Sequence, residues 1–159
     1  MKPTSSAADF STKTRNICAA LIALMLSYAA ISKLADYQLS KQQMLNQVFP
    51  EPVALQLTWL IPAVEIFISL ALINKLTTIY GLYAALILLV AFSIYISLTM
   101  TGLFGRVPCS CGGILMHMSY SIHLLFNLIF IILAVVGIRP DNYWLANLIR
   151  NLKKKGGTK

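Results

Sequence analysis

Two cysteines separated by one serine are the residues of this chain best suited to chemistry. Cys109 and Cys111 lie in the segment GLFGRVPCSCGG, where Pro108, Gly112 and Gly113 favour a bent backbone. Residues two apart in an extended chain have α-carbons about 6.6 Å apart, near the upper limit for a disulfide. A disulfide over so short a loop would be strained and readily reduced. The pair is therefore interpreted as a redox pair, the alternative being two inert thiols in a turn.

Two histidines follow the cysteines at even spacing, and one arginine precedes them. Cys109, Cys111, His117 and His123 together supply two thiols and two imidazoles, which is a chemically adequate zinc set. Their spacing does not match the usual zinc-finger patterns, so no metal site is favoured. A histidine that assists a thiolate or caps a helix fits the pattern better. Arg106 would favour the charged form of a nearby thiol.

An acidic residue interrupts an apolar segment. Glu65 lies in the middle of WLIPAVEIFISL, and an acidic residue at the centre of a membrane-spanning helix costs about 2.5–3.5 kcal/mol. Such residues serve a proton path, a binding site or an interhelical contact. The structural alternative is a protonated carboxyl bonded to a polar side chain of a neighbouring helix (Asn127, Ser69 or Tyr95). Lys33 and Asp36 are expected to form an interfacial pair nearby.

The amino-acid composition indicates which class of protein these residues belong to. The chain has 159 residues, of which 58% are hydrophobic and only 11% charged, whereas soluble domains carry about 25% charged residues. A water-soluble monomer is therefore excluded. Four apolar runs are long enough for helical crossings of about 20 residues each, and they lack the alternation of β-barrel strands. We expect an all-α integral membrane protein with a four-transmembrane-helix bundle at about 17–34, 53–73, 78–100 and 120–138.

The distribution of basic residues predicts how the bundle is oriented. Ten of the thirteen Lys and Arg residues flank the ends expected on one face, which places both termini in the cytoplasm. The sequence then divides into an N-terminal arm (1–16), the transmembrane domain (17–138) and a basic tail (139–159). The Cys-x-Cys connection faces the oxidising outer compartment, where disulfides form. The net charge of +8 is explained by these flanks and does not require nucleic acid.

Two smaller features complete the predicted architecture. The stretch DNYWLANLIRNLKKK after Pro140 is typical of an amphipathic helix that lies on anionic lipid, the alternative being an ordinary anchoring tail. The third cysteine, Cys18, lies among apolar residues of the first run and is expected to be a small buried side chain.

Three segments carry a resemblance to a known family. They are SKLADY at the end of the first run, WLIPAVEIFISLAL in the second, and GLFGRVPCSCGG before the fourth. In this order they resemble the MauE/DoxX family of redox-associated membrane proteins, in particular the methylamine-utilisation MauE branch. The likeness spans most of residues 17–138, and the Cys-x-Cys-Gly segment is its most specific part.

The resemblance implies a redox function. It implies a four-helix bundle similar in outline to vitamin K epoxide reductase-like proteins, and a role in disulfide formation or thiol transfer for exported proteins. Cys109 and Cys111 would be the redox pair, and Glu65 and Lys33 would match the family's polar positions. Vitamin K epoxide reductase-like enzymes also use an embedded Cys-x-x-Cys beside a quinone. This chain has no such motif, so a partner that carries electrons is favoured over a quinone near Glu65.

The predicted function is therefore that of a bacterial inner-membrane thiol–disulfide redox protein, which supports disulfide formation or electron transfer to exported proteins through an external Cys-x-Cys pair. Its expected partners are a thioredoxin-like protein or other exported protein thiols, with quinone as the only cofactor considered. Two alternatives are a non-catalytic subunit or assembly factor of a larger membrane complex, and a metal-binding membrane protein. The latter would use Cys109, Cys111, His117 and His123 as ligands.

Overall fold

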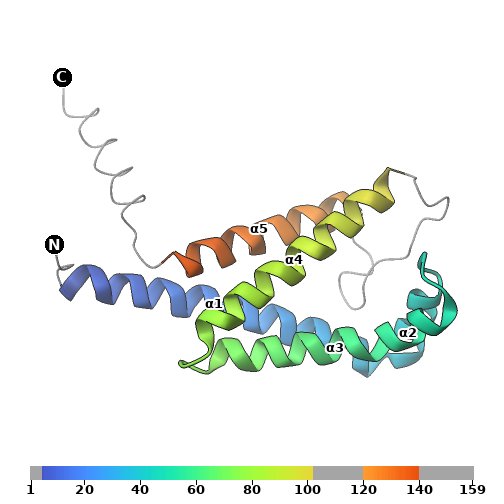
Figure 1. The fold of residues 1–159 in the computed structure, drawn as a ribbon, viewed down its shortest axis with the longest axis horizontal. Helices are drawn as coiled ribbons and strands as arrows, with labels where there is room; N and C mark the ends of the chain where they lie inside the picture. Colours follow the sequence, from blue (N-terminus) through green and yellow to red (C-terminus); the bar gives the residue numbers. More distant parts are fainter. Residues whose placement is uncertain (1–4, 102–119, 140–159) are drawn as a thin grey trace, which may run out of the picture.

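Helices are the only regular secondary structure in the described part of the chain. The computed structural model describes residues 5–101 and 120–139, and within them there are five helices and no strand (Figure 1). These are α1 (Ser5–Ala35), α2 (Tyr37–Leu45), α3 (Glu51–Ile73), α4 (Thr78–Met100) and α5 (Tyr120–Ile138).

Four of these helices have membrane-spanning length and hydropathy. The segments are Thr12–Ala35, Glu51–Ile73, Thr78–Met100 and Ser121–Ile138. They confirm the predicted all-α architecture with four membrane-length helices. The structure differs from the expectation at the amino terminus, where α1 already begins at Ser5 within the predicted arm. No proline or glycine interrupts residues 5–16, so the helix continues through them. The predicted amphipathic tail helix lies outside the described residues.

Asp36 separates α1 from the short helix α2. Its carboxylate Oδ1 accepts a hydrogen bond from the backbone N–H of Leu39 at 3.2 Å, so it caps the amino terminus of α2. The expected interfacial pair between Lys33 and Asp36 is therefore wrong, because Asp36 serves the backbone of the next helix and Lys33 bonds elsewhere. After α2, Pro50 caps α3 and Pro52 lies in its first turn, where proline's missing N–H does not matter.

The four long helices form a ring in which each packs mainly against two neighbours. α1 packs against α3 and α5, and α4 packs against the same two helices from the opposite corner (Figure 1). One end of the bundle carries α2, and we call it the α2 end. The other end carries the turn between α3 and α4 at residues 74–77, and we call it the turn end.

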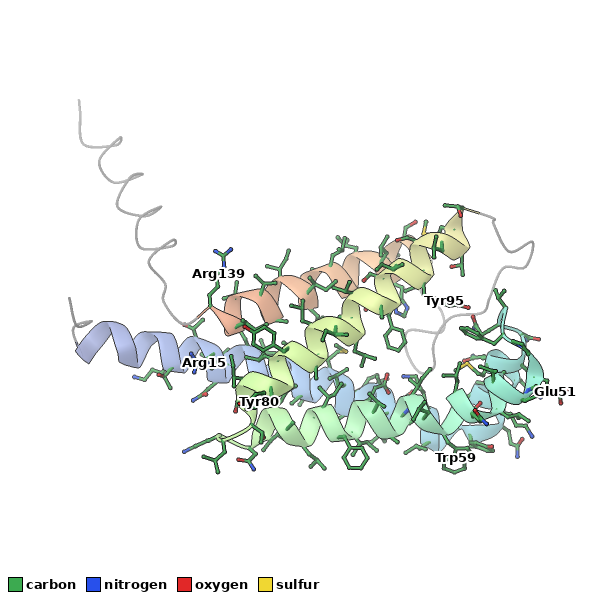
Figure 2. The ribbon with its side chains drawn as sticks, in the orientation of Figure 1. Arg15, Glu51, Trp59, Tyr80, Tyr95 and Arg139 are labelled. Atoms are coloured by element: carbon green, nitrogen blue, oxygen red, sulfur yellow. The ribbon has the colours of Figure 1, made fainter. Side chains whose placement is uncertain are left out.

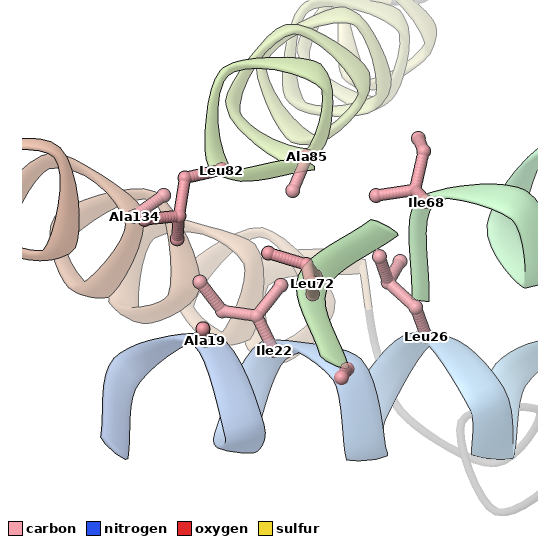
Figure 3. Packing of buried hydrophobic residues seen from close by; sticks show 9 residues of the cluster. Ala19, Ile22, Leu26, Ile68, Leu72, Leu82, Ala85 and Ala134 are labelled. Carbon is pink, nitrogen blue, oxygen red and sulfur yellow. The ribbon is translucent and has the colours of Figure 1, made fainter. Parts of the chain in front are cut away.

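An apolar cluster fills the interior nearer the turn end. Its members come from all four long helices and interdigitate closely (Figure 3): Ala19, Ile22, Ala23, Leu26, Ile68, Leu72, Leu82, Ala85 and Ala134. Two glycines allow the close approach of the helices there. A Cβ on Gly81 would lie 2.9 Å from the backbone nitrogen of Leu72, and one on Gly137 would lie 3.2 Å from the Cβ of Cys18. Cys18 is buried, as expected.

The outer faces of the helices are apolar, as a bilayer requires. Large hydrophobic side chains project away from the bundle all around it (Figure 2), among them Leu24, Ile31, Phe67, Leu70, Ile87 and Ile132. In a soluble protein this surface would cause aggregation, whereas lipid tails solvate it. The polar side chains are instead buried inside, mostly on the α2 side of the apolar cluster.

A polar candidate site inside the helix bundle

An ion pair joins α1 to α3 in the interior of the bundle. The Lys33 ammonium donates to both carboxylate oxygens of Glu65, at 2.7 Å to Oε1 and 2.9 Å to Oε2. The side chains are 11% and 2% exposed, respectively. Lys33 also donates to the backbone carbonyl of Ala29 at 3.4 Å. The sequence singled out both residues but not their pairing, and the three neighbours expected for Glu65 are not its partners in the structure.

The sequence of each helix explains how these two charges meet. On α3, Glu65, Ile68, Ser69 and Leu72 recur at helical spacing and form one buried face. On α1, Ala29 and Ala30 are buried beside Lys33, and their small side chains leave room for α3 to approach. Two antiparallel helices with these faces in contact bring the lysine directly opposite the glutamate.

A second polar contact lies about one helical turn away, toward the turn end. The hydroxyl groups of Ser27 and Ser69 are 2.6 Å apart, and Ser69 also donates to the backbone carbonyl of Ala23 at 3.1 Å. Contacts of this kind between membrane helices contribute about 0.6 kcal/mol each on average. Together with the ion pair, they fix the register of α1 on α3.

α5 contributes two further buried polar side chains. His123 and Asn127 are one turn apart on the same face of the helix and are 8% and 5% exposed. The Nδ2 atom of Asn127 is buried and has no hydrogen-bond partner among the described residues.

The packing of α5 against α1 gives the level of these residues in the bundle. Gly137 lies opposite Cys18, and the two helices run antiparallel. Ten residues further toward the α2 end on each helix, Asn127 reaches the level of Tyr28 and Ala29. Asn127 is therefore level with the serine contact, whereas His123 is level with the ion pair.

An aromatic contact ties α4 to the connection between α2 and α3. The Tyr95 hydroxyl donates to the Oε1 atom of Gln47, and the Tyr95 ring stacks on Phe49 with centroids 5.7 Å apart. Tyr95 was one of the neighbours expected for Glu65. It instead joins the α2 end of α4 to the connection between α2 and α3.

The structure pairs two of the seven predicted site residues and buries a third on a neighbouring helix. Lys33 and Glu65 form an ion pair between α1 and α3, and His123 is buried on α5. Arg106, Cys109, Cys111 and His117 lie outside the described residues. Within the described residues, no group of three or more His, Cys, Asp or Glu side chains could hold a metal ion. This finding leaves the predicted metal alternative untested, because three of its four ligands lie elsewhere.

One residue of this site was missed by the sequence reasoning as a functional candidate. Asn127 entered only as a hydrogen-bond partner for Glu65. The signal available in the sequence was its position, since an amide within an apolar run and four residues after His123 occupies the same helix face. The sequence alone does not show that this face turns inward.

Comparisons with known proteins agree with the resemblance in the sequence. The family model described as methylamine utilisation protein MauE matches residues 11–140, which include all four membrane-length helices. No curated protein and no solved structure matches the chain. The outline similarity to vitamin K epoxide reductase-like proteins therefore stays a prediction. The chain belongs to the MauE family, and it is a multi-pass membrane protein of a family associated with methylamine utilisation.

Proposed function

We propose that this MauE-family protein is an inner-membrane thiol–disulfide exchange protein whose reactive pair is Cys109 and Cys111. The observation that carries the proposal is the Cys-Ser-Cys sequence between α4 and α5, in a chain with no other closely spaced cysteines. α4 ends and α5 begins at the α2 end of the bundle (Figure 1). The cysteine pair is thus attached to the end nearer the polar interior.

The charges of the described residues support an external position for this pair. The turn end carries four basic side chains in the described residues, Lys13, Arg15, Lys75 and Arg139, and the flanking segments add more basic residues than the two acidic ones, Asp9 and Asp141. At the α2 end, Lys33 is neutralised by Glu65, and Lys41 is accompanied by Asp36 and Glu51. The positive-inside rule then assigns the turn end to the cytoplasm and the α2 end to the periplasm or outside.

The chemistry follows from two thiols that can exchange with a partner. The thiolate of one cysteine attacks a sulfur of the partner's disulfide, and a mixed disulfide forms as the other partner sulfur leaves as a thiolate. The second cysteine attacks the mixed disulfide and releases the reduced partner. The pair ends as a disulfide and the partner as a dithiol, and the reverse sequence oxidises the partner. A thioredoxin-like protein is the partner class that fits this exchange.

Single cysteine variants provide the test of this proposal. In Cys109→Ser or Cys111→Ser, one thiol can attack but none can resolve, so a mixed disulfide with the partner should accumulate for one of the two variants. Trapping with acid and an alkylating reagent, followed by non-reducing electrophoresis and mass spectrometry, measures it. Cys18→Ala is the matched control, because Cys18 is buried and should form no mixed disulfide. Full biological activity in a double Cys→Ser variant would instead support the assembly-factor alternative.

A further inference from the structure

The charges of the described residues are distributed unevenly between the two ends of the bundle. Asp36 and Glu51 lie at the α2 end, and Glu65 lies on the α2 side of the apolar cluster. These are the three acidic residues whose side chains the structure describes. The turn end instead carries the four basic side chains named above, and Figure 2 shows Arg15 and Arg139 there. An anionic molecule would therefore be attracted to the turn end.

The contact between α1 and α5 gives the depth of three of these basic residues. Gly137 lies against Cys18 where α5 ends. Along α1, Arg15 and Lys13 lie about 4.5 and 7.5 Å beyond the level of Cys18, since each helical residue rises about 1.5 Å. Arg139 lies about 3 Å beyond Gly137. All three cations thus fall within about 8 Å of the end of the bundle, which is close to the thickness of the headgroup region on one side of a bilayer.

The turn between α3 and α4 combines a fourth cation with an exposed apolar surface. Lys75 and Leu76 are both exposed, and Leu76, at 85%, is the most exposed large hydrophobic side chain of the described residues. Ile73, at the end of α3, and Tyr80, in the first turn of α4, are also exposed. Lysine and tyrosine beside large apolar side chains are typical of the membrane–water interface, where the apolar parts face the lipid and the polar tips reach the headgroups.

Hydrogen bonds from neighbouring side chains hold this turn in its shape. Asn74 Oδ1 accepts from the backbone N–H of Leu76 at 3.0 Å, and the Thr77 hydroxyl donates to the backbone carbonyl of Ala71 at 2.8 Å. Neither bond uses the ammonium of Lys75. In the part of the chain that the structure describes, Lys75 also has no acidic partner. The turn therefore presents a cation and an apolar side chain next to each other from a backbone that is already ordered.

We propose that the turn end binds an anionic phospholipid, with the lipid phosphate at Lys75 and the acyl chains against Leu76 and Ile73. The guanidinium groups of Arg15 and Arg139 lie at a similar depth and add positive potential around the phosphate. Each basic residue near a membrane surface strengthens the attraction to anionic lipid. The site does not involve the cysteine pair, so it goes beyond the proposed function and can be tested independently of it.

The combination of charge and apolar surface is what selects this occupant. A soluble anion would neutralise Lys75 but would leave Leu76 exposed to water. A phospholipid places its acyl chains and its phosphate at the depths of these two side chains. A zwitterionic phospholipid supplies the same phosphate but carries its own cation, so the basic surroundings favour the anionic lipid.

The test measures lipid binding by the full chain with native mass spectrometry. The protein in a neutral detergent is titrated with phosphatidylglycerol, or with phosphatidylcholine that has the same acyl chains, and the Kd of the first bound lipid is determined. We expect a lower Kd for phosphatidylglycerol, raised about fivefold in Lys75→Gln. Leu76→Ser should raise the Kd of both lipids, because it removes apolar contact area. Lys41→Gln is the matched control, since it removes the same charge at the α2 end and should change neither Kd.

Several outcomes would overturn the site. Equal Kd values for the two lipids in the parent chain would contradict its charge selectivity. Phosphatidylglycerol binding unchanged in both Lys75→Gln and Leu76→Ser would place the lipid elsewhere on the chain. An effect of Lys41→Gln as large as that of Lys75→Gln would indicate a response to net charge alone. Displacement of the lipid by glycerol phosphate, which has the headgroup charge without acyl chains, would indicate a site for soluble anions. Circular dichroism should show parental helix content in each variant, because Lys75 and Leu76 are exposed.

Discussion

At the scale of single residues, the main feature is the Lys33–Glu65 ion pair, which is buried inside the bundle, where a charge loses its hydration. Neither Lys33 nor Glu65 is more than 11% exposed, so each depends on the other for compensation of its lost hydration. Removal of one partner leaves an uncompensated buried charge. Removal of both leaves an apolar contact, which is often as stable as the original pair.

This reasoning predicts a strongly non-additive pair of substitutions. Lys33→Met alone and Glu65→Met alone should each lower the free energy of unfolding by about 3–5 kcal/mol, or prevent the chain from folding. The double variant Lys33→Met/Glu65→Met should recover most of that loss. Reversible unfolding in mixed micelles with increasing dodecyl sulfate measures all three. A double variant as unstable as the sum of the singles would show that the ion pair is not what couples the two positions.

The same pair shows what could and could not be read from the sequence. Glu65 can be identified from the sequence because it is an acidic residue within a run of apolar residues. Its partner was not identified, since Lys33 is 32 residues away and meets it only through the register of α1 on α3. The nearby Asp36 was the natural local choice for Lys33, but it caps α2. Local spacing does not reveal which of two partners a long side chain will reach.

At the scale of helices, close packing at glycine sets the distance between α3 and α4. A Cβ on Gly81 would come within 2.9 Å of the backbone nitrogen of Leu72, and backbone atoms cannot rotate away. Gly137 presents a different environment. A Cβ there would lie 3.2 Å from the Cβ of Cys18 and from both methyl carbons of Leu82, so the neighbours need to shift by only a few tenths of an ångström.

Alanine substitution should distinguish these two glycines. Gly81→Ala should force α3 and α4 apart and destabilise the fold by about 1–3 kcal/mol, the usual cost of overpacking. Gly137→Ala should cost less, because its Cβ would come no closer than 3.2 Å to any neighbouring atom. Thermal unfolding of the two purified variants, followed by circular dichroism, provides the comparison. A larger loss for Gly137→Ala would contradict the packing described for the turn end.

The four long helices were predictable for a reason that does not extend to α2. A membrane-spanning helix can be recognised in a sequence by the length and apolar composition of its segment. Proline residues at 50 and 52 also indicate where α3 begins. α2 has nine residues, a mixed polar sequence and no buried side chain. It depends on the Asp36 cap and on packing against α3, neither of which has a sequence pattern of comparable strength.

At the scale of the whole molecule, the two ends of the bundle differ in charge. Lys13, Arg15, Lys75 and Arg139 lie at the turn end, and the connection that holds the cysteine pair begins at the other end. Apolar runs and basic flanks were sufficient to predict the number of spans and to propose an orientation. The order of helices around the ring required tertiary packing, since all four outer faces are similarly apolar.

The proposed orientation predicts opposite accessibility for two exposed positions. With Cys109 and Cys111 changed to serine, a cysteine at Thr101 should react with a membrane-impermeant maleimide added to intact cells. A cysteine at Asn74, in the turn between α3 and α4, should react only after the membrane is permeabilised. Cys18 should not react with the maleimide in either case, because it is buried. The reverse labelling pattern would invert the topology and place the cysteine pair in the cytoplasm.

The most direct test of the central claim is the redox state of Cys109 and Cys111 in intact cells during a brief pulse of reductant. Alkylation of free thiols at successive times, followed by mass spectrometry of the peptide that contains both cysteines, gives the oxidised fraction. Thiol–disulfide exchange predicts a pair that is reduced by the pulse and quickly reoxidised after its removal, with mixed disulfides present in between. A pair that remains in one redox state throughout would contradict the exchange function.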